Sequence, residues 1–359
     1  MRRTIITFLT LAIGVVFLFA QATADAKWHQ QHEVIDENGM GTMLHDVHFT
    51  GAQNGLVVGQ GGLILVTADG GASWTKMEVD MSPPGGRRRP GGGGGPPGGF
   101  GGGSSPALYN IYFVDANVGY ITGGRGTILK TEDGGKTWAR KMARNAASGQ
   151  GQNQRPRPMR ANLMGVQMLN TEVGFIAGSE NTILKTTDGG ETWIGSSQRA
   201  RVGETRNNLE NIWFVSPTQG WIVGSFGTLL HTADGGETWE KRNAGFDNNL
   251  FGIHFLDANT GWLCGQEGLV LHTSDGGETW VQQSTGSEDD LHDIVFVDAM
   301  VGWAVGAYNS ILHTTDGGKT WSATKVGNGF GTFKAVSATD KAHCWAVDDW
   351  GVIVGYSPE

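Results

Sequence analysis

Six copies of one octet, Thr-x-Asp-Gly-Gly-x-(Ser/Thr)-Trp, restrict the fold of this chain more than any other feature of its sequence. The last three copies are 41 residues apart. That spacing is the length of one four-stranded propeller blade, and the wider gaps between the earlier copies indicate insertions. We predict a structural role for the octet aspartates and tryptophans, which are Asp69, Asp133, Asp188, Asp234, Asp275 and Asp316, and Trp74, Trp138, Trp193, Trp239, Trp280 and Trp321.

The residues around each octet complete a repeat of four strands. A glycine and an apolar or aromatic residue precede each octet at a constant distance, and an alternating apolar run, such as the one that begins at Leu250, lies upstream. Such alternation is typical of a strand in a sheet. A seventh unit, residues 333–356, ends where its octet would begin, whereas residues 27–34 form a spare strand. We therefore predict an all-β, seven-bladed propeller with four-stranded blades, in which the N-terminal strand closes the last blade.

The chemistry of the octet favours a tight turn over a ligand site. Tandem glycines permit positive φ angles, the Thr and Asp side chains can bind turn backbone groups, and the Trp can anchor the turn in the sheet. Calcium requires six to eight oxygen ligands, whereas each turn supplies one carboxylate. We therefore expect no metal site in the octets and no cofactor.

The chain divides into an export signal and one domain. Arg2 and Arg3 precede an apolar run that ends in a small-x-small cleavage pattern at residues 22–24. We therefore expect residues 1–24 to be a signal peptide that directs export by either the general secretion or the twin-arginine pathway. Residues 25–359 should form a single propeller. Cys264 and Cys344 fall in blades five and seven, which are not neighbours, so we expect free, buried thiols.

Some polar residues recur at equivalent positions of different units. Three histidines lie three residues before an octet aspartate and should point apart around the ring, so we interpret them as strand side chains rather than metal ligands. Four first-strand residues share another register, which we expect near the central channel. The histidines are His231, His272 and His313, and the first-strand residues are Asp46, Asn110, Asn211 and Asp293.

Three inserts, near residues 80–107, 143–160 and 195–208, carry an excess of arginine over acidic residues in a chain whose net charge is −9. Each insert joins a fourth strand to the next blade, so all three should lie on one face, opposite the octets. The segregated charge favours an anionic partner, either acidic protein loops or lipid headgroups, or it only keeps long loops soluble. Nucleic acid is a poor candidate for an exported acidic protein. The candidate partner-binding residues are Arg87, Arg88, Arg89, Arg155, Arg157, Arg160, Arg199, Arg201 and Arg206, and Arg144 is a further arginine of the second insert.

The octets resemble the Asp-box (BNR) repeats of bacterial neuraminidases. The "GWxVG…GTILxTxDGGxTW" units resemble the photosystem II stability and assembly factor family over residues 27–359. This resemblance implies a non-catalytic scaffold that binds subunits of a membrane protein complex or other envelope proteins. Such a protein would work in the periplasm, or in the thylakoid lumen of an oxygenic photosynthetic source, and we expect it to be a monomer. The alternative is an Asp-box glycoside hydrolase, sialidase-like or glucanase-like, but no carboxylate pair or tyrosine nucleophile stands out from the repeat.

Overall fold

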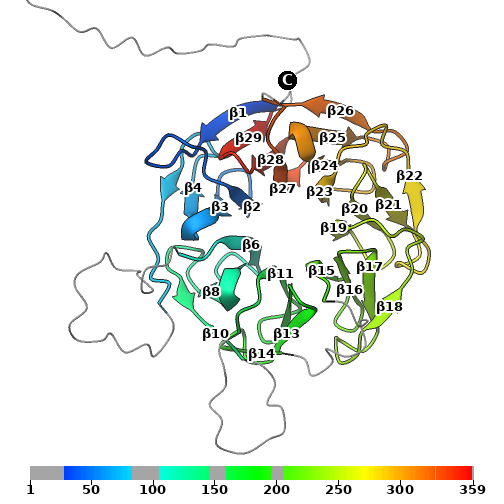
Figure 1. Ribbon diagram of the computed structural model, residues 1–359, viewed down its shortest axis with the longest axis horizontal. Helices are drawn as coiled ribbons and strands as arrows, with labels where there is room; N and C mark the ends of the chain where they lie inside the picture. The colour runs from blue at the N-terminus through cyan, green and yellow to red at the C-terminus, as the bar shows by residue number, and fades with distance from the viewer. Residues whose placement is uncertain (1–27, 83–104, 145–158, 196–205, 328, 358–359) are drawn as a thin grey trace, which may run out of the picture.

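The computed structural model describes residues 28–82, 105–144, 159–195, 206–327 and 329–357. These residues form seven sheets arranged in a ring around a central opening (Figure 1), which confirms the predicted all-β, seven-bladed propeller. The helical segments of the described chain are three short 3-10 turns, η1 (Gln60–Gly62), η2 (Gly124–Gly126) and η3 (Ala307–Asn309). In these residues, no helix has the length and apolar character needed to cross a membrane.

The first three blades follow the chain in order. Blade 1 contains β2 (Leu44–Phe49), β3 (Gly55–Gly59), β4 (Ile64–Thr67) and β5 (Thr75–Lys76). Blade 2 contains β6 (Leu108–Phe113), β7 (Gly119–Gly123), β8 (Thr127–Thr131) and β9 (Ala139–Arg140). Blade 3 contains β11 (Leu163–Met168), β12 (Gly174–Gly178), β13 (Thr182–Thr186) and β14 (Thr192–Gly195), together with β10 (Met142–Arg144).

The remaining blades continue the same pattern. Blade 4 contains β15 (Leu209–Phe214), β16 (Gly220–Gly224), β17 (Thr228–Thr232) and β18 (Glu240–Arg242). Blade 5 contains β19 (Leu250–Phe255), β20 (Gly261–Gly265), β21 (Val270–Thr273) and β22 (Val281–Gln283). Blade 6 contains β23 (Leu291–Phe296), β24 (Gly302–Gly306), β25 (Ser310–Thr314) and β26 (Ser322–Lys325). Blade 7 contains β27 (Phe333–Asp340), β28 (His343–Asp348), β29 (Val352–Tyr356) and β1 (Trp28–Glu33).

The N-terminal strand closes the ring, as predicted. Strand β1 pairs antiparallel with β29, and the paired residues run from Trp28 opposite Tyr356 to Glu33 opposite Val352. The Trp28 side chain is buried, and its ring centroid lies 5.4 Å from that of Tyr356. Blade 7 therefore combines the two ends of the propeller in one sheet and leaves no open edge at β29.

Blade 3 has a fifth strand that the repeat pattern does not predict. Strand β10 lies at the start of the second insert and pairs in parallel with β14, the outer strand of the next blade. Its middle residue, Ala143, is buried in the core of blade 3. Three residues are too few to show an alternating pattern, so only the pairing partner identifies this segment as a strand.

The octets form tight turns, as blade 4 illustrates. The Asp234 carboxylate accepts hydrogen bonds from the Thr232 hydroxyl (2.8 Å), from the Thr238 amide (2.9 Å) and from the Thr238 hydroxyl (2.5 Å). The Thr232 hydroxyl accepts a bond from the amide of Gly236, which has a φ of +79°. All six octets repeat these bonds. Their regularity is consistent with the structural reading of the octet.

Neighbouring blades interlock through the second octet glycine and the octet tryptophan. A Cβ atom on Gly277 would lie 2.3 Å from the Trp221 ring of the preceding blade, so only glycine fits there. The same Trp221 ring packs edge-on against Trp280, with centroids 6.2 Å apart. The octet tryptophans are accordingly buried (Trp138, Trp193, Trp239) or partly buried (Trp74, Trp280, Trp321).

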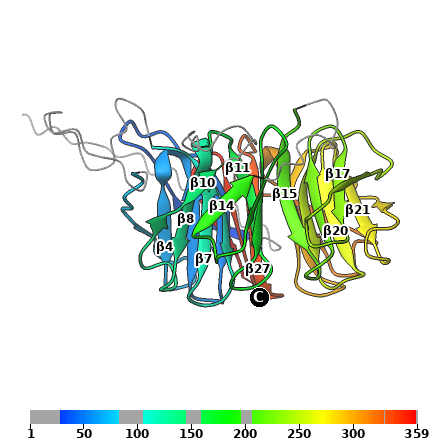
Figure 2. The same ribbon diagram turned by 90° about the horizontal axis from the view of Figure 1, so that it is seen from below.

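The ring has two distinct faces, which Figure 2 shows edge-on. Each octet lies beside the turn between the first two strands of its blade, as the bond from the Gly70 amide to the Gln53 carbonyl shows (2.9 Å). We call this side the octet face. The connections between blades lie on the other side, where the Asn181 amide donates to the Asn207 carbonyl at the end of the third insert (2.8 Å). We call that side the insert face, and its position opposite the octets agrees with the sequence prediction.

The cysteines and the repeated histidines occupy buried or ring-packed positions. Both thiols, at Cys264 and Cys344, are free and buried, as predicted. The three repeated histidines each pack on an aromatic ring of their own blade, with centroids 4.3 to 5.0 Å apart, as His231 on Trp221, His272 on Trp262 and His313 on Trp303. In the described part of the chain, no three His, Cys, Asp or Glu side chains are grouped to hold a metal ion.

Candidate functional site at the mouth of the central channel

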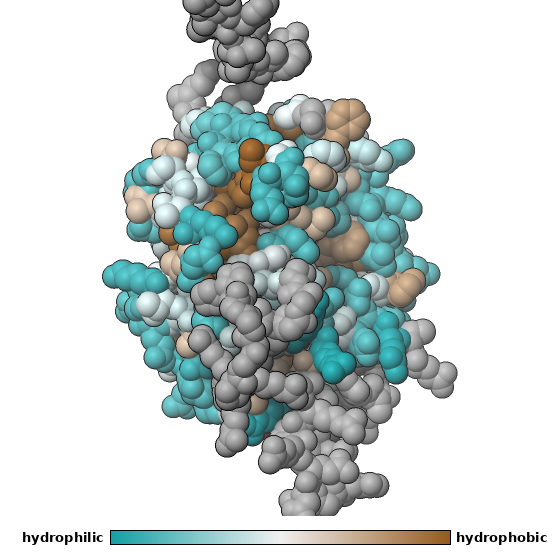
Figure 3. All heavy atoms as spheres, turned by 60° about the vertical axis from the view of Figure 1, so that its left-hand side comes forward, coloured by the Kyte–Doolittle hydropathy of each residue, from teal (hydrophilic) through white to brown (hydrophobic). Residues whose placement is uncertain are grey.

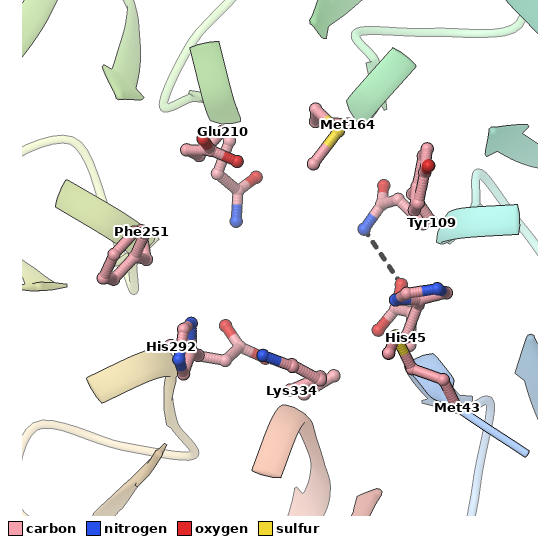
Figure 4. Close-up of a pocket in the computed structure, with 13 residues that line it drawn as sticks. Met43, His45, Tyr109, Met164, Glu210, Phe251, His292 and Lys334 are labelled. Carbon is pink, nitrogen blue, oxygen red and sulfur yellow. Dashed lines mark hydrogen bonds between the residues drawn. The ribbon is translucent and has the colours of Figure 1, made fainter. Parts of the chain in front are cut away.

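A β-bulge interrupts the first strand of every blade at the same place. In blade 1, Leu44 pairs with Gly59 and Asp46 pairs with Val58, so His45 is the extra residue between them. A bulge turns its extra residue out of the regular pleat. The seven bulged residues line one pocket of about 380 Å³ at the insert-face end of the channel (Figure 4). These residues, which we call the mouth ring, are His45, Tyr109, Met164, Glu210, Phe251, His292 and Lys334.

The mouth ring places opposite charges on opposite sides of the opening. Figure 4 shows Glu210 and Lys334 across the pocket from each other. Burial raises the pKa of the Glu210 carboxyl. Burial lowers the pKa of the Lys334 ammonium, although Asp349 lies 3.9 Å away and favours the charged form. A ligand that spans the opening can therefore meet both charges at once.

Aromatic contacts support the two histidines of the mouth ring. His45 packs edge-on against Tyr109 with ring centroids 5.0 Å apart, and His292 stacks on Phe251 at 4.8 Å. Burial lowers the pKa of both imidazoles to about 4, so both are neutral at pH 7. Between the charged groups the pocket therefore offers neutral, largely flat surfaces.

Polar residues one position further along the first strands tie neighbouring blades together. The Asp46 carboxylate accepts hydrogen bonds from the Ile111 amide (2.7 Å) and from the Asn110 side chain (2.9 Å) in blade 2. The Asp293 carboxylate likewise accepts a bond from the Val336 amide of blade 7 (2.9 Å). Burial raises the pKa of both carboxyls, to about 7 for Asp293. The prediction that Asp46, Asn110, Asn211 and Asp293 lie near the channel is correct, since all four line the pocket.

The carboxyl groups of the pocket are better suited to holding blades than to hydrolysis. Asp46, Glu210 and Asp293 all line the pocket, so three carboxyls share one opening. Two of them, however, bind backbone amides of the next blade, and a glycosidase needs two carboxyls free to transfer a proton or attack the sugar.

Two of the candidate arginines lie on the insert face near the mouth ring. Arg160 and Arg206 are exposed and stand four residues before Met164 and Glu210, respectively. Arg206 forms an exposed ion pair with Glu180 (3.4 Å). Arg144 is exposed at the end of β10, on the outer edge of blade 3. The other candidates lie outside the described residues, namely Arg87, Arg88, Arg89, Arg155, Arg157, Arg199 and Arg201.

Sequence reasoning did not identify the mouth ring. The available signal is the second residue of each first strand, which differs in chemical type from blade to blade while the residue before it stays Leu or Phe. In a regular strand, this residue would simply point to the opposite side of the sheet from the buried residue before it. The bulge turns it out of the pleat, and it does so in all seven blades, so the seven side chains line one pocket.

Comparisons with known proteins agree with this fold. A family model described as photosynthesis system II assembly factor YCF48 matches residues 103–194, 144–243 and 198–285, and a BNR/Asp-box repeat model matches residues 312–323. No curated protein matches the sequence.

Three solved structures show the same architecture at low sequence identity. A structure described as YCF48 bound to D1 peptide has 18% identity and a TM-score of 0.67, covering 93% of this chain and 97% of that one. YCF48 from Cyanidioschyzon merolae has 19% identity and a TM-score of 0.66, covering 92% and 98%. The GH74 xyloglucanase from Xanthomonas campestris has 13% identity and a TM-score of 0.65, covering 92% of this chain and 53% of the enzyme.

Proposed function

Because this chain belongs to the family described as photosynthesis system II assembly factor YCF48, we propose that it is a non-catalytic scaffold that binds a membrane-complex subunit and helps the complex to assemble or persist. The matched segments span residues 103–285, just over half of the chain. A solved YCF48 structure is described as bound to a D1 peptide, which supports a polypeptide segment as the ligand class here.

The mouth ring is the observation that carries this proposal. Seven blades contribute seven side chains of six residue types to one pocket, so the opening has no repeat symmetry and can orient an asymmetric ligand. Its charged groups, Glu210 and Lys334, are separated by aromatic and imidazole rings, a mixture that fits a polypeptide segment. The exposed Arg160 and Arg206 lie on the same face. We therefore propose an acidic loop of a membrane protein subunit as the ligand, with the insert face as its docking side.

The proposed compartment follows from the N-terminal sequence. Residues 1–24 carry the pattern of an export signal, and they lie outside the described residues. We propose that the mature protein works in the periplasm, or in the thylakoid lumen if the source is oxygenic and photosynthetic. A chromosomal fusion to a periplasm-specific reporter tests this: activity that depends on residues 1–24 supports export, and activity without them contradicts it.

Charge reversal on the insert face tests the docking proposal. The variant Arg160→Glu/Arg206→Glu should retain the melting temperature of the parent, because exposed charges contribute at most about 1 kcal/mol each. It should recover less of the membrane partner in a pull-down from source membranes, and the difference should shrink as salt rises toward physiological strength. The matched control, Lys241→Glu/Lys319→Glu, makes the same change in net charge away from the insert face. Equal recovery by both variants would contradict the proposal.

A glycoside hydrolase remains the second candidate function. Glu210 favours it, because this carboxyl is not one of the two that bind amides of the next blade and burial raises its pKa, as a general acid requires. The GH74 enzyme with the same architecture gives a substrate class to test first. Release of reducing sugar from xyloglucan by the parent, and its loss in Glu210→Gln, would replace the scaffold proposal by this one.

A further inference from the structure

The interface between blades 1 and 2 lacks an aromatic ring that every other interface contains. The second strand of six blades carries a Tyr, Phe or Trp at one position, and this ring packs toward the following blade, as Phe175 stacks on Phe214 (4.7 Å) and Trp262 on Phe296 (3.6 Å). The equivalent residue of blade 1 is Leu56. The six aromatic residues are Tyr120, Phe175, Trp221, Trp262, Trp303 and Trp345.

The shorter side chain leaves free space on the octet face. A Cβ atom on Gly190 would lie 2.4 Å from the ring of Tyr120, and one on Gly236 would lie 2.4 Å from the ring of Phe175. At the interface of blades 1 and 2, a Cβ atom on the equivalent Gly135 would lie 3.3 Å from Leu56. A hollow of about 610 Å³ opens at this interface, within the size range of ligand pockets. Its walls include Leu56, Val66 and Met77 of blade 1.

One aromatic ring is left partly uncovered in this hollow. Phe113 ends the first strand of blade 2 and is half-buried, whereas the equivalent residues Phe49, Phe214 and Phe255 are at most 6% exposed. Phe49 is covered by Trp345 of the preceding blade, with centroids 3.5 Å apart. Phe113 stacks on His48 at 5.4 Å and lies edge-on to Trp138 at 6.1 Å, but Leu56 stands where Trp345 stands against Phe49.

The charges around the hollow also differ from those of the next two interfaces. Lys130 and Lys185 of blades 2 and 3 each form an ion pair with a glutamate in the octet of the following blade. At the interface of blades 1 and 2, the residue equivalent to these lysines is Val66, so no such pair crosses it. The octet carboxylates Asp69 and Asp133 line the hollow against one cation, Lys136, so the rim is acidic on balance.

We propose that this hollow, the blade 1–2 slot, binds a polypeptide partner through an aromatic side chain that stands next to a basic one. The aromatic ring of the partner takes the place that Tyr, Phe or Trp of the chain itself takes at the other six interfaces, and covers Phe113. The neighbouring basic side chain meets the acidic rim at Asp69 and Asp133. This site lies on the octet face, so it is separate from the mouth ring and can engage a second segment or a second partner.

Three small indole probes test the ring and the charge together. Tryptamine is a cation, N-acetyltryptophanamide is neutral, and N-acetyltryptophan is an anion, while all three carry the same ring. In a titration of the whole protein followed by methyl NMR, tryptamine should shift the Leu56 and Met77 methyl signals. The Met164 methyl at the mouth ring should not move. We expect affinity to fall from tryptamine to the amide to the anion, by at least fivefold overall.

Filling the slot from within provides the decisive variant. Leu56→Trp restores the missing ring, so it should lower tryptamine affinity at least tenfold and raise the melting temperature by a few degrees. Leu56→Phe serves the same purpose if the larger ring prevents folding, and Val281→Trp, which adds an indole to an exposed outer strand, is the matched control. If a folded slot-filling variant binds tryptamine as tightly as the parent does, the slot is not the binding site. If N-acetyltryptophan binds as tightly as tryptamine or more tightly, the partner does not carry a basic side chain next to its aromatic one.

Discussion

At the scale of single residues, the octet shows a division between a polar turn and an apolar anchor. Trp239 is 4% exposed and lies edge-on to Phe175 and Phe214, with centroids 6.5 and 5.7 Å away, whereas Asp234 holds an exposed turn. Replacing Trp239 with Ala should therefore cost about 3–5 kcal/mol of unfolding free energy. Replacing Asp234 with Ala should cost only about 1–2 kcal/mol, through lost hydrogen bonds. Urea denaturation of both variants measures this difference, and calcium-dependent melting that Asp234→Ala abolishes would contradict the structural reading.

The buried Asp293 carboxyl predicts a dependence of stability on pH. Burial raises its pKa in the folded protein to about 7, from an ordinary value of 3.8. Between these two pH values the folded state holds a proton that the unfolded state has lost. The protonated carboxyl therefore contributes its full share to the free energy of unfolding below about pH 4, and this share declines as the pH rises to about 7. The total decline is about 1.4 kcal/mol per unit of difference between the two pKa values. Asp293→Asn removes this slope and keeps an oxygen that can accept the Val336 amide, as Asn110 accepts the Val166 amide at the equivalent position (3.0 Å).

Chemical denaturation at pH 5 and pH 8 checks this prediction. The stability of Asp293→Asn relative to the parent should be higher at pH 8 than at pH 5, and an unchanged difference would show that Asp293 does not titrate in this range.

At the scale of secondary-structure elements, β1 has the largest predicted effect, because it joins the two ends of the ring. Deletion of residues 27–34 removes the pairing with β29 and uncovers Tyr356 and Val354, which pack in the same cluster as Trp28. We expect a loss of several kcal/mol, since an open edge and an exposed apolar surface arise together. Thermal unfolding of the truncated and mature chains compares them directly. Identical melting temperatures would contradict closure by β1.

The elements also show how far the sequence alone can lead. The octets are local and recur, so they predict seven blades. The repeat register then shows that the last unit lacks a strand, which predicts closure by β1, and it places Cys264 and Cys344 in blades that are not neighbours, which predicts free thiols. Strand β10 and the bulge at His45 are not predictable in the same way. Both depend on which strand lies alongside, β14 in one case and β3 in the other, and the local repeat pattern does not indicate that pairing.

At the scale of the whole molecule, the two faces carry different chemistry. The insert face combines the mouth ring with the exposed Arg160 and Arg206, and the octet face combines six similar turns with the blade 1–2 slot. In the space-filling view, hydrophobic side chains lie recessed among hydrophilic ones on the flank of the ring (Figure 3).

Site-specific photocrosslinking tests the proposal that the insert face binds a membrane protein subunit. A photoreactive phenylalanine analogue replaces Phe251 in the mouth ring or, as a control, the exposed Met300 in the turn between β23 and β24 on the octet face. After illumination of cells that express each variant, mass spectrometry identifies the crosslinked proteins. We expect the Phe251 position to crosslink a subunit of a membrane complex and the Met300 position not to do so. Crosslinking of the same proteins from both positions, or from Met300 alone, would contradict it.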